Sequence, residues 1–246
     1  MSSLNGKIIV VTGGNGLIGK ELLKAIKQSG AIAINLDLHK EEILKENCIY
    51  CDITDQNSII STIQQIVVKY EKIDGWVNNA YPRTEDWGVN FEMIPLNSWR
   101  ENVDMQMNSV FLICQKVLEV MKGQGFGNII NIASIYGVVG PDFSVYNETN
   151  MTMPAAYSAI KGGIINFTRY LASYYGQFGI RINCVSPGGI FDNQNDKFVK
   201  QYKSKVPMKR MGLPSDISPS VVFLLSDGAS YITGHNLMID GGWTAI

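Results

Sequence analysis

Residues 12–19 have the sequence TGGNGLIG, between a short apolar run, Lys7 to Thr12, and a longer run with helical periodicity, Leu17 to Ser29. Two overlapping glycine spacings fit this stretch, G-x-G-x-x-G from Gly14 and T-G-x-x-G-x-x-G from Thr12. Both imply the same geometry, because the glycines allow a tight turn in which the backbone closely approaches a pyrophosphate. The N–H groups and the dipole at the start of the helix then receive the charge of the pyrophosphate. The stretch therefore predicts a strand, a turn and a helix that bind a dinucleotide.

The rest of the chain repeats this alternation of strand-length and helix-length runs. The expected strands are Lys7 to Thr12, Ala31 to Leu36, Ile49 to Asp52, Gly75 to Asn78, Asn128 to Ala133, Arg181 to Val185 and Leu237 to Asp240. The expected helices are Leu17 to Ser29, Asn57 to Tyr70, Ser98 to Met121, Ala156 to Tyr175 and Ser215 to Leu225, and the third opens with a capping box from Ser98 to Glu101. Right-handed crossovers place such helices on both faces of a parallel sheet. The expected fold class for residues 1–246 is therefore α/β, a single-domain, Rossmann-like doubly wound sandwich with a parallel sheet of about seven strands.

Two irregular stretches interrupt the alternation. Tyr136 to Pro154 and Gly188 to Lys205 are rich in Gly, Pro, Asn and Asp. They are longer than ordinary connections, so we expect functional loops there.

The composition excludes several classes of protein. With 46% hydrophobic and 17% charged residues among 246, the chain has enough apolar material for a buried sheet and no bias towards disorder. A net charge of -1 gives no general attraction to nucleic acid or to an anionic membrane. No apolar run reaches the roughly 18 residues of a membrane span. Met1 to Val11 lacks the pattern of a secretory signal, so we expect a cytoplasmic protein.

Cys48 and Cys51 form a C-x-x-C pair, a spacing that also occurs in redox and zinc sites. No second Cys or His pair lies nearby to complete a zinc site, and Cys51 falls in an apolar segment expected to be a buried strand. We therefore expect no metal. The other cysteines are Cys114 and Cys184, and a reducing compartment suits all four.

Asp37 ends the second expected strand, 18 residues after Gly19. This is close to the spacing at which a carboxylate accepts hydrogen bonds from the adenosine ribose. A 2'-phosphate beside Asp37 would meet like-charge repulsion, which favours NAD over NADP. His39 and Lys40 follow closely and leave NADP open.

Gly14 to Lys20 also fits the start of a phosphate-binding G-x-x-x-x-G-K-[ST] loop, which would indicate a nucleotide hydrolase or kinase. The next residue is Glu21, where such a loop needs a hydroxyl to hold magnesium. This alternative is therefore disfavoured.

Polar residues with the potential for acid–base chemistry follow in the second half of the chain. Asn131 to Ser134 closes a strand, which places Ser134 at the carboxyl edge of the sheet, where doubly wound folds bind ligands. Tyr157 and Lys161 share one face of an expected helix. At about 4 Å and an effective dielectric constant near 20, the Lys161 ammonium would favour the phenolate by roughly 4 kcal/mol, or about three pKa units. The pair predicts a Tyr157 pKa near neutrality, suited to exchanging a proton with a carbonyl or alcohol oxygen that Ser134 also contacts.

These features, in this order, resemble the single-domain branch of the short-chain dehydrogenase/reductase family over nearly the whole chain. The resemblance continues through Asn78-Asn79-Ala80, Asn183 to Gly189, Arg210 to Asp216, Thr233-Gly234 and Asp240 to Gly242. The segments Asn79 to Arg83 and Tyr146 to Pro154 resemble the flagellin-modification branch of the family, which is associated with bacterial legionaminic-type sugar biosynthesis.

The resemblance implies roles for individual residues. Tyr157 would be the catalytic acid/base, Lys161 would lower its pKa and hold the nicotinamide ribose, and Ser134 would position the substrate. The implied cofactor-binding residues are Gly13, Asn15, Gly16, Leu17, Ile18, Gly19, Asp37, Asp52, Ile53, Asn79, Ala80, Tyr157, Lys161, Pro187, Gly188 and Ile190. A homo-oligomer, a tetramer or a dimer, is implied as well, with the two long helices packed against symmetry mates.

The sequence departs from the family pattern at several positions. Tyr81 replaces a usual glycine and Asp192 replaces a threonine. The helix asparagine of the family's catalytic tetrad aligns with Gln106, although a shift of two residues would offer Asn108 instead. Ser134 and Tyr157 are further apart than is common, because of Ser144 to Pro154, which we expect to shape a substrate pocket.

The expected function is hydride transfer between NAD(P)(H) and a carbonyl or secondary alcohol, on a sugar or amino-sugar derivative of bacterial surface glycans. The alternative is a catalytically impaired regulator or scaffold that kept the nucleotide site. A serine hydrolase is disfavoured, because the two histidines, His39 and His235, accompany no G-x-S-x-G motif.

Overall fold

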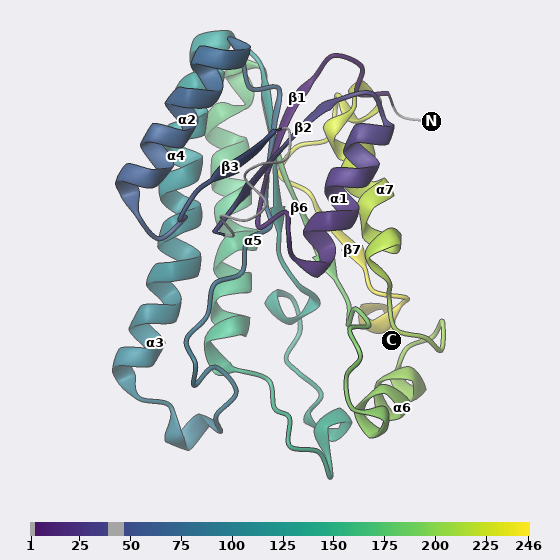
Figure 1. The fold of residues 1–246 in the computed structure, drawn as a ribbon. Helices are drawn as coiled ribbons and strands as arrows, with labels where there is room; N and C mark the ends of the chain where they lie inside the picture. The colour runs from purple at the N-terminus through teal and green to yellow at the C-terminus, as the bar shows by residue number, and fades with distance from the viewer. Residues whose placement is uncertain (1–2, 39–46) are drawn as a thin grey trace.

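The computed structural model describes residues 3–38 and 47–246, which form a seven-stranded parallel sheet with helices on both faces (Figure 1). The strands are β1 Ile8–Thr12, β2 Ile32–Asp37, β3 Cys48–Tyr50, β4 Gly75–Asn78, β5 Gly127–Ile132, β6 Ile180–Pro187 and β7 Asn236–Ile239. Their spatial order is β3-β2-β1-β4-β5-β6-β7, with every neighbouring pair parallel. The order reverses between β1 and β4, and such a switch point opens a crevice at the carboxyl ends of the strands. The predicted fold class is confirmed.

The helices are α1 Leu17–Gln28, α2 Gln56–Tyr70, α3 Leu96–Val103, α4 Ser109–Gln124, α5 Ala155–Tyr175, α6 Asp196–Lys205 and α7 Pro214–Leu225. Between α3 and α4 the chain forms a π-helical turn, η3 Asp104–Asn108. Short 3-10 turns are η2 Phe91–Met93, η4 Ile135–Gly137, η5 Phe143–Tyr146, η6 Gly176–Phe178, η7 Asp227–Ala229 and η8 Trp243–Ala245.

Alternate residues of the strands feed two separate cores, because successive side chains of a strand point to opposite faces. Ile8 and Val10 pack in a core with residues of α2, α4 and α5, whereas Ile9 and Val11 pack in a core with residues of α1 and α7. Figure 1 shows these two helix layers on either side of the sheet. Both faces of β1 are buried, which explains why its sequence is continuously apolar.

Three expectations about elements are wrong. The capping box at Ser98 does not form, because the helix already begins at Leu96, after Pro95, and the Ser98 hydroxyl donates to Asp86 Oδ1 at 2.7 Å. The single helix expected from Ser98 to Met121 is divided by the π turn. The third strand ends at Tyr50 rather than Asp52, although Cys51 is buried, as expected.

The expected loop Gly188 to Lys205 contains α6. Its N-cap is Asn195, whose side chain accepts hydrogen bonds from the amides of Lys197 and Phe198. Its buried residues Phe198, Val199 and Tyr202 lie at helical spacing. This periodicity was present in the sequence, but the surrounding Gly, Asn and Asp residues indicated a loop.

Within residues 3–38 and 47–246, no helix is both long and apolar enough to cross a bilayer. The same residues include no cluster of three or more His, Cys, Asp or Glu side chains that could hold a metal ion. Cys48, Cys51, Cys114 and Cys184 are free thiols.

Candidate active site

The turn from β1 into α1 leaves no space for side chains at two of its glycines. Gly13 has φ +65°, and a Cβ there would lie 2.7 Å from Ala80 Cα at the end of β4. A Cβ at Gly19 would overlap the carbonyl oxygen of Gly13. The turn therefore presents bare backbone at the switch point of the sheet.

The start of α1 is suited to an anion. Its N-cap is Gly16, so no side chain caps the first amides, and its first turn carries no acidic residue. Amides and a helix dipole in this state attract a phosphate group. The backbone cradle and this helix end together fit the pyrophosphate of a dinucleotide.

Asp37 lies at the carboxyl end of β2, beside the same turn. Its Oδ2 accepts a hydrogen bond from the Asn15 amide at 2.9 Å, and its Oδ1 accepts one from the Leu38 amide at 2.8 Å. The Asn15 side chain is held by Asn35, whose Nδ2 donates to Asn15 Oδ1 at 2.8 Å. The carboxylate is thus fixed at the carboxyl end of β2, beside the glycine turn. His39 and Lys40 lie outside the described residues.

The remaining nucleotide-side candidates differ in their contacts, and of Asn79, Ala80, Asp52 and Ile53 only Asn79 lines the cavity described below. Asn79 Nδ2 donates to the carbonyl oxygens of Thr12 and Gly13, both at 3.0 Å, and the Ala80 amide donates to Thr12 Oγ1. Asp52 Oδ1 accepts hydrogen bonds from the amide and hydroxyl of Thr54. Ile53 is 8% exposed and belongs to the core that contains α2.

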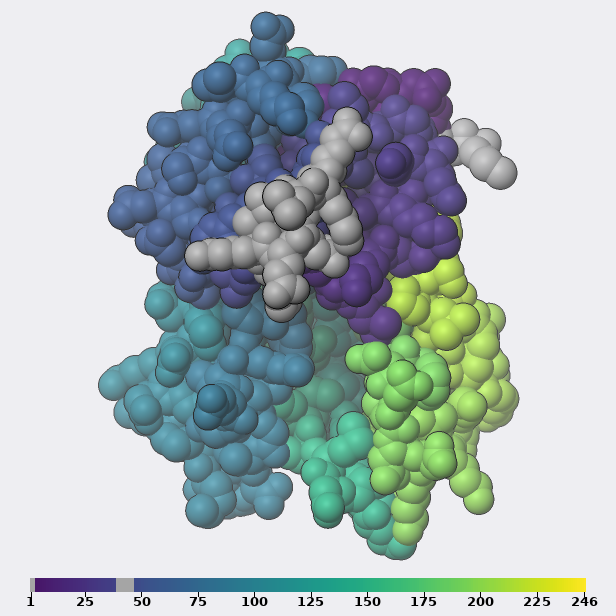
Figure 2. Space-filling model, in the orientation of Figure 1, coloured from purple at the N-terminus to yellow at the C-terminus, as the bar shows by residue number. Residues whose placement is uncertain are grey.

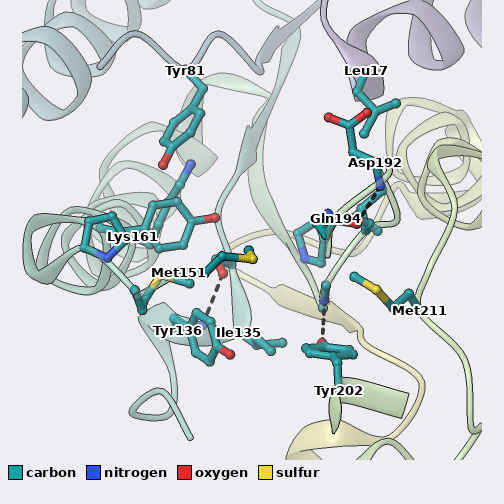
Figure 3. A pocket seen from close by; sticks show the side chains of 18 of the residues that line it. Leu17, Tyr81, Ile135, Tyr136, Met151, Lys161, Asp192, Gln194, Tyr202 and Met211 are labelled. Atoms are coloured by element: carbon teal, nitrogen blue, oxygen red, sulfur yellow. Dashed lines mark hydrogen bonds between the residues drawn. The ribbon is translucent and has the colours of Figure 1, made fainter. Parts of the chain in front are cut away.

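A cavity of about 450 Å³ continues from this point along the carboxyl edge of the sheet (Figure 3). It brings together the three catalytic candidates and six further cofactor candidates. These residues are Ser134, Tyr157 and Lys161, with Leu17, Ile18, Asn79, Pro187, Gly188 and Ile190.

Three buried polar side chains fix the helix that carries Tyr157 and Lys161. Asn78 Nδ2 donates to Asn131 Oδ1 at 2.8 Å, and Asn131 Nδ2 donates to Thr168 Oγ1 at 2.9 Å. This chain of hydrogen bonds ties β4 and β5 to α5. Deviations of α5 from its place would leave these buried amides unpaired, which is costly.

The pKa shifts of Tyr157 and Lys161 differ from those predicted from the sequence. Burial lowers the pKa of Lys161 to about 8, and its Nζ donates to the Ile132 carbonyl oxygen at 2.8 Å. Burial also raises the pKa of Tyr157, which a hydrogen bond with Ser134 partly offsets. The predicted downward shift of the Tyr157 pKa is therefore wrong for this state of the site. Lys161 Nζ lies 5.6 Å from the centre of the Tyr157 ring; Lys161 is 7% exposed, and Tyr157 is partly exposed to the cavity.

Tyr81, at the position of a usual glycine, joins an aromatic cluster around Tyr157. Its ring meets the Tyr157 ring edge-on with centroids 5.6 Å apart, and the Trp87 ring lies 5.8 Å from Tyr81 and 6.3 Å from Tyr157. Lys161 Nζ lies 5.6 Å from the centre of the Tyr81 ring as well. Tyr81 therefore contacts both members of the acid–base pair.

Gln106 and Asn108, the two residues considered for the position of the family's helix asparagine, differ in burial. Gln106 is 4% exposed within the π turn, and neither its Oε1 nor its Nε2 has a hydrogen-bond partner in the described part of the chain. Asn108 is exposed and donates to Asp104 Oδ1. Gln106 therefore faces the interior.

Sequence reasoning missed part of the cavity wall. Phe198 and Tyr202 from α6, and Met211 beyond it, line the cavity, and so does Trp87. The segment before Pro154 was expected to shape a pocket, and Tyr146, Met151, Thr152 and Met153 do line the cavity. Figure 2 shows the surface of α6 and the surface of α3 with its preceding loop on either side of that segment.

Comparison with known proteins gives matches along the whole chain. A family model described as Enoyl-(Acyl carrier protein) reductase matches residues 18–244. Post-translational flagellin modification protein A of Campylobacter coli is 38% identical over 98% of this chain and 99% of its own length. The 7alpha-hydroxysteroid dehydrogenase of Bacteroides fragilis is 30% identical over 99% of this chain and 96% of its own length.

Solved structures agree with this result. A short-chain dehydrogenase of Leptospira borgpetersenii with bound NAD+ has a TM-score of 0.89 and 36% identity, covering 98% of this chain and 94% of that chain. NAD+-bound xylitol dehydrogenase has a TM-score of 0.85 and 28% identity, covering 97% of this chain and 99% of that chain.

Proposed function

Because the chain belongs to the short-chain dehydrogenase/reductase family, we propose that residues 1–246 act as one domain that transfers a hydride between NAD(H) and a secondary alcohol or carbonyl, on a sugar or amino-sugar derivative. One observation carries this proposal. The cavity that holds Ser134, Tyr157 and Lys161 reaches the start of α1, at Leu17 and Ile18, next to the glycine turn.

The cofactor, when bound, accepts or supplies the hydride. Asp37, the backbone of residues 13–19 and Asn79 would hold its adenosine and pyrophosphate end, and Pro187, Gly188 and Ile190 its nicotinamide end. In alcohol oxidation, Tyr157 takes the hydroxyl proton of the substrate, and in carbonyl reduction it returns one. Ser134 Oγ, which is 5% exposed, hydrogen-bonds the same substrate oxygen.

Lys161 supplies the charge that this proton transfer requires. Burial disfavours an ionised Tyr157, so the phenolate forms only while a cation stands beside it. Lys161 is the one cationic side chain among the described residues that line the cavity. The Lys161 ammonium stabilises the Tyr157 phenolate. Because the pKa of Lys161 is about 8, this positive charge is present at neutral pH and is lost as the pH rises above 8.

The sugar substrate is supported by the flagellin-modification relative, whose identity to this chain is 38%. The test is a screen of sugars, amino sugars, sugar phosphates and nucleotide sugars for absorbance change at the nicotinamide band. Turnover that disappears in Tyr157→Phe supports the proposal. Absence of turnover with any alcohol or carbonyl, together with retained NADH binding, would favour the regulator or scaffold.

The assembly proposed is a homotetramer or homodimer in the cytoplasm, where the four free thiols suit a reducing compartment. Val110, Leu118 and Leu171 pack in the chain's own core. A row of aromatic rings on α4 and α5 remains at the surface, with Phe111 48%, Tyr170 62% and Tyr174 51% exposed. Light scattering at micromolar concentration tests this, and a monomer would refute it.

A further inference from the structure

One wall of the cavity is built from two segments, α6 and the stretch from Asp142 to Pro154, which share a small hydrophobic core. That core comprises Val145, Tyr146, Phe198, Val199, Tyr202, Val206 and Met211. Ion pairs Lys197–Glu148 and Lys205–Asp142, and a hydrogen bond from Gln201 Nε2 to the Asn147 carbonyl oxygen, join the same segments. Tyr146 is therefore held from both sides, and its side chain is 8% exposed.

A second phenol, Tyr136, lines the same cavity and is 7% exposed. The Tyr136 hydroxyl is hidden from water and has no hydrogen bond of ordinary geometry within the described residues. Burial raises the pKa of Tyr136 and of Tyr146, and each hydroxyl also acts on the pKa of the other, so the two phenols are neighbours. Because Tyr146 lines the cavity, its hydroxyl can donate a hydrogen bond to a group bound there.

Tyr146 lines the same cavity as Ser134 and Tyr157. Burial raises the pKa of Tyr146, and charge repulsion from the nearby Tyr157 adds to that rise. Figure 3 shows Tyr136 on the side of the cavity that carries Lys161 and Tyr81, across from Asp192 and Met211. A ligand oxygen held by Tyr157 and Ser134 therefore has a second hydroxyl donor beside it.

The cavity offers little to a charged group. Its described lining has two charged side chains, Lys161 and Asp192, and Lys161 already donates to Ile132. The rest of this wall is apolar, with Met151, Met153 and Phe198. An anionic substituent beside the reacting carbon would lose its hydration without gaining a cation.

We propose that Tyr146, backed by Tyr136, binds a second hydroxyl of the substrate beside the reacting carbinol carbon. The reacting ring is then an uncharged, polyhydroxylated one. This inference rests on the proposed function, since it concerns the same site. It makes Tyr146 a specificity-determining residue, because a buried donor left unpaired by a monoalcohol penalises that substrate.

The test uses matched ring compounds with NAD+: cyclohexanol, cis- and trans-cyclohexane-1,2-diol, and 2-hydroxycyclohexanecarboxylate. The wild type should oxidise one diol with a kcat/KM at least about tenfold above cyclohexanol and should disfavour the carboxylate. Tyr146→Phe should abolish that preference by lowering the kcat/KM of the diol and raising that of cyclohexanol, since no donor is then left unpaired. Tyr136→Phe should lower the kcat/KM of the diol less than Tyr146→Phe does. Tyr231→Phe, which changes a fully exposed ring, is the control and should keep the wild-type preference.

The outcomes separate the two claims. Equal kcat/KM for diols and cyclohexanol, a preference for the carboxylate, or a diol preference that survives in a folded Tyr146→Phe variant would overturn the inference and leave the oxidoreductase intact. Failure of every ring compound and every sugar of the wider screen, with NADH bound, would overturn the proposed function and the inference with it.

Discussion

Replacing Lys161 with methionine should make the protein more stable at neutral pH and less stable at high pH. Burial lowers the pKa of Lys161 from 10.5 to about 8. That difference corresponds to about 3 kcal/mol of penalty for keeping the ammonium in the folded state below pH 8. The penalty shrinks as the pH rises towards 10.5, because the folded protein then no longer holds the proton. Methionine keeps the length of the side chain and removes the ionisation.

The substitution also removes the hydrogen bond from Lys161 Nζ to the Ile132 carbonyl oxygen. Its loss costs about 1–2 kcal/mol at every pH. We therefore expect Lys161→Met to gain about 1–2 kcal/mol in free energy of unfolding at pH 7 and to lose this gain by pH 10. For a chain of this size, the gain corresponds to a rise in Tm of roughly 2–8 °C.

Urea denaturation of both proteins between pH 7 and pH 10 measures this difference directly. All other titrating groups are common to the two proteins and cancel to first order. If the two curves of unfolding free energy against pH ran parallel, Lys161 would not be a buried ammonium, and the charge assigned to it beside Tyr157 would have no basis.

Three further predictions concern catalysis and the cofactor. Tyr157→Phe should reduce turnover by about 10²- to 10⁴-fold with NADH binding retained, and a variant above a tenth of wild-type activity with rate-limiting chemistry would contradict the assignment. NAD(H) should bind at least about tenfold tighter than NADP(H), and Asp37→Ser should reduce this ratio of the two dissociation constants. Fluorescence titration with each cofactor measures both constants. Gly13→Ala should lose at least about 1–2 kcal/mol of stability and weaken NADH binding, through its positive φ and its approach to Ala80. The matched control is Gly123→Ala in α4, where an added Cβ would have no atom within 4 Å. This substitution should stabilise the protein by up to about 1 kcal/mol. Equal effects on stability at Gly13 and Gly123 would contradict the close approach assigned to Gly13.

The nucleotide half of the site was predictable because its signals are local. The apolar strand, the glycine spacing and Asp37 lie within 31 residues, from position 7 to position 37, and each depends on backbone geometry that its own sequence dictates. The alternation of strand-length and helix-length runs along the chain was enough to predict the parallel sheet.

The substrate half was less predictable, because tertiary contacts determine it. Tyr146 and Phe198 share a core only once α6 docks on the segment before Pro154. The pKa of Tyr157 depends on how deeply α5 buries it, and the spacing of Tyr157 and Lys161 on a helix carries no information about that depth. Ser98 shows the same limit. Its hydroxyl donates to Asp86, which lies before the helix, and the local pattern that suggested a capping box does not include this residue.

The π turn at Asp104–Asn108 makes this helical region tolerant of the loss of one residue. A π turn holds about one residue more than an α turn, so deleting one residue here would convert it to ordinary α-helix and leave α3 and α4 in their present relative rotation. Ile113 and Val117 would then stay in the core. A deletion in the middle of α4 has no extra residue to remove, so it would turn the following positions by about 100° and take Val117 out of the core.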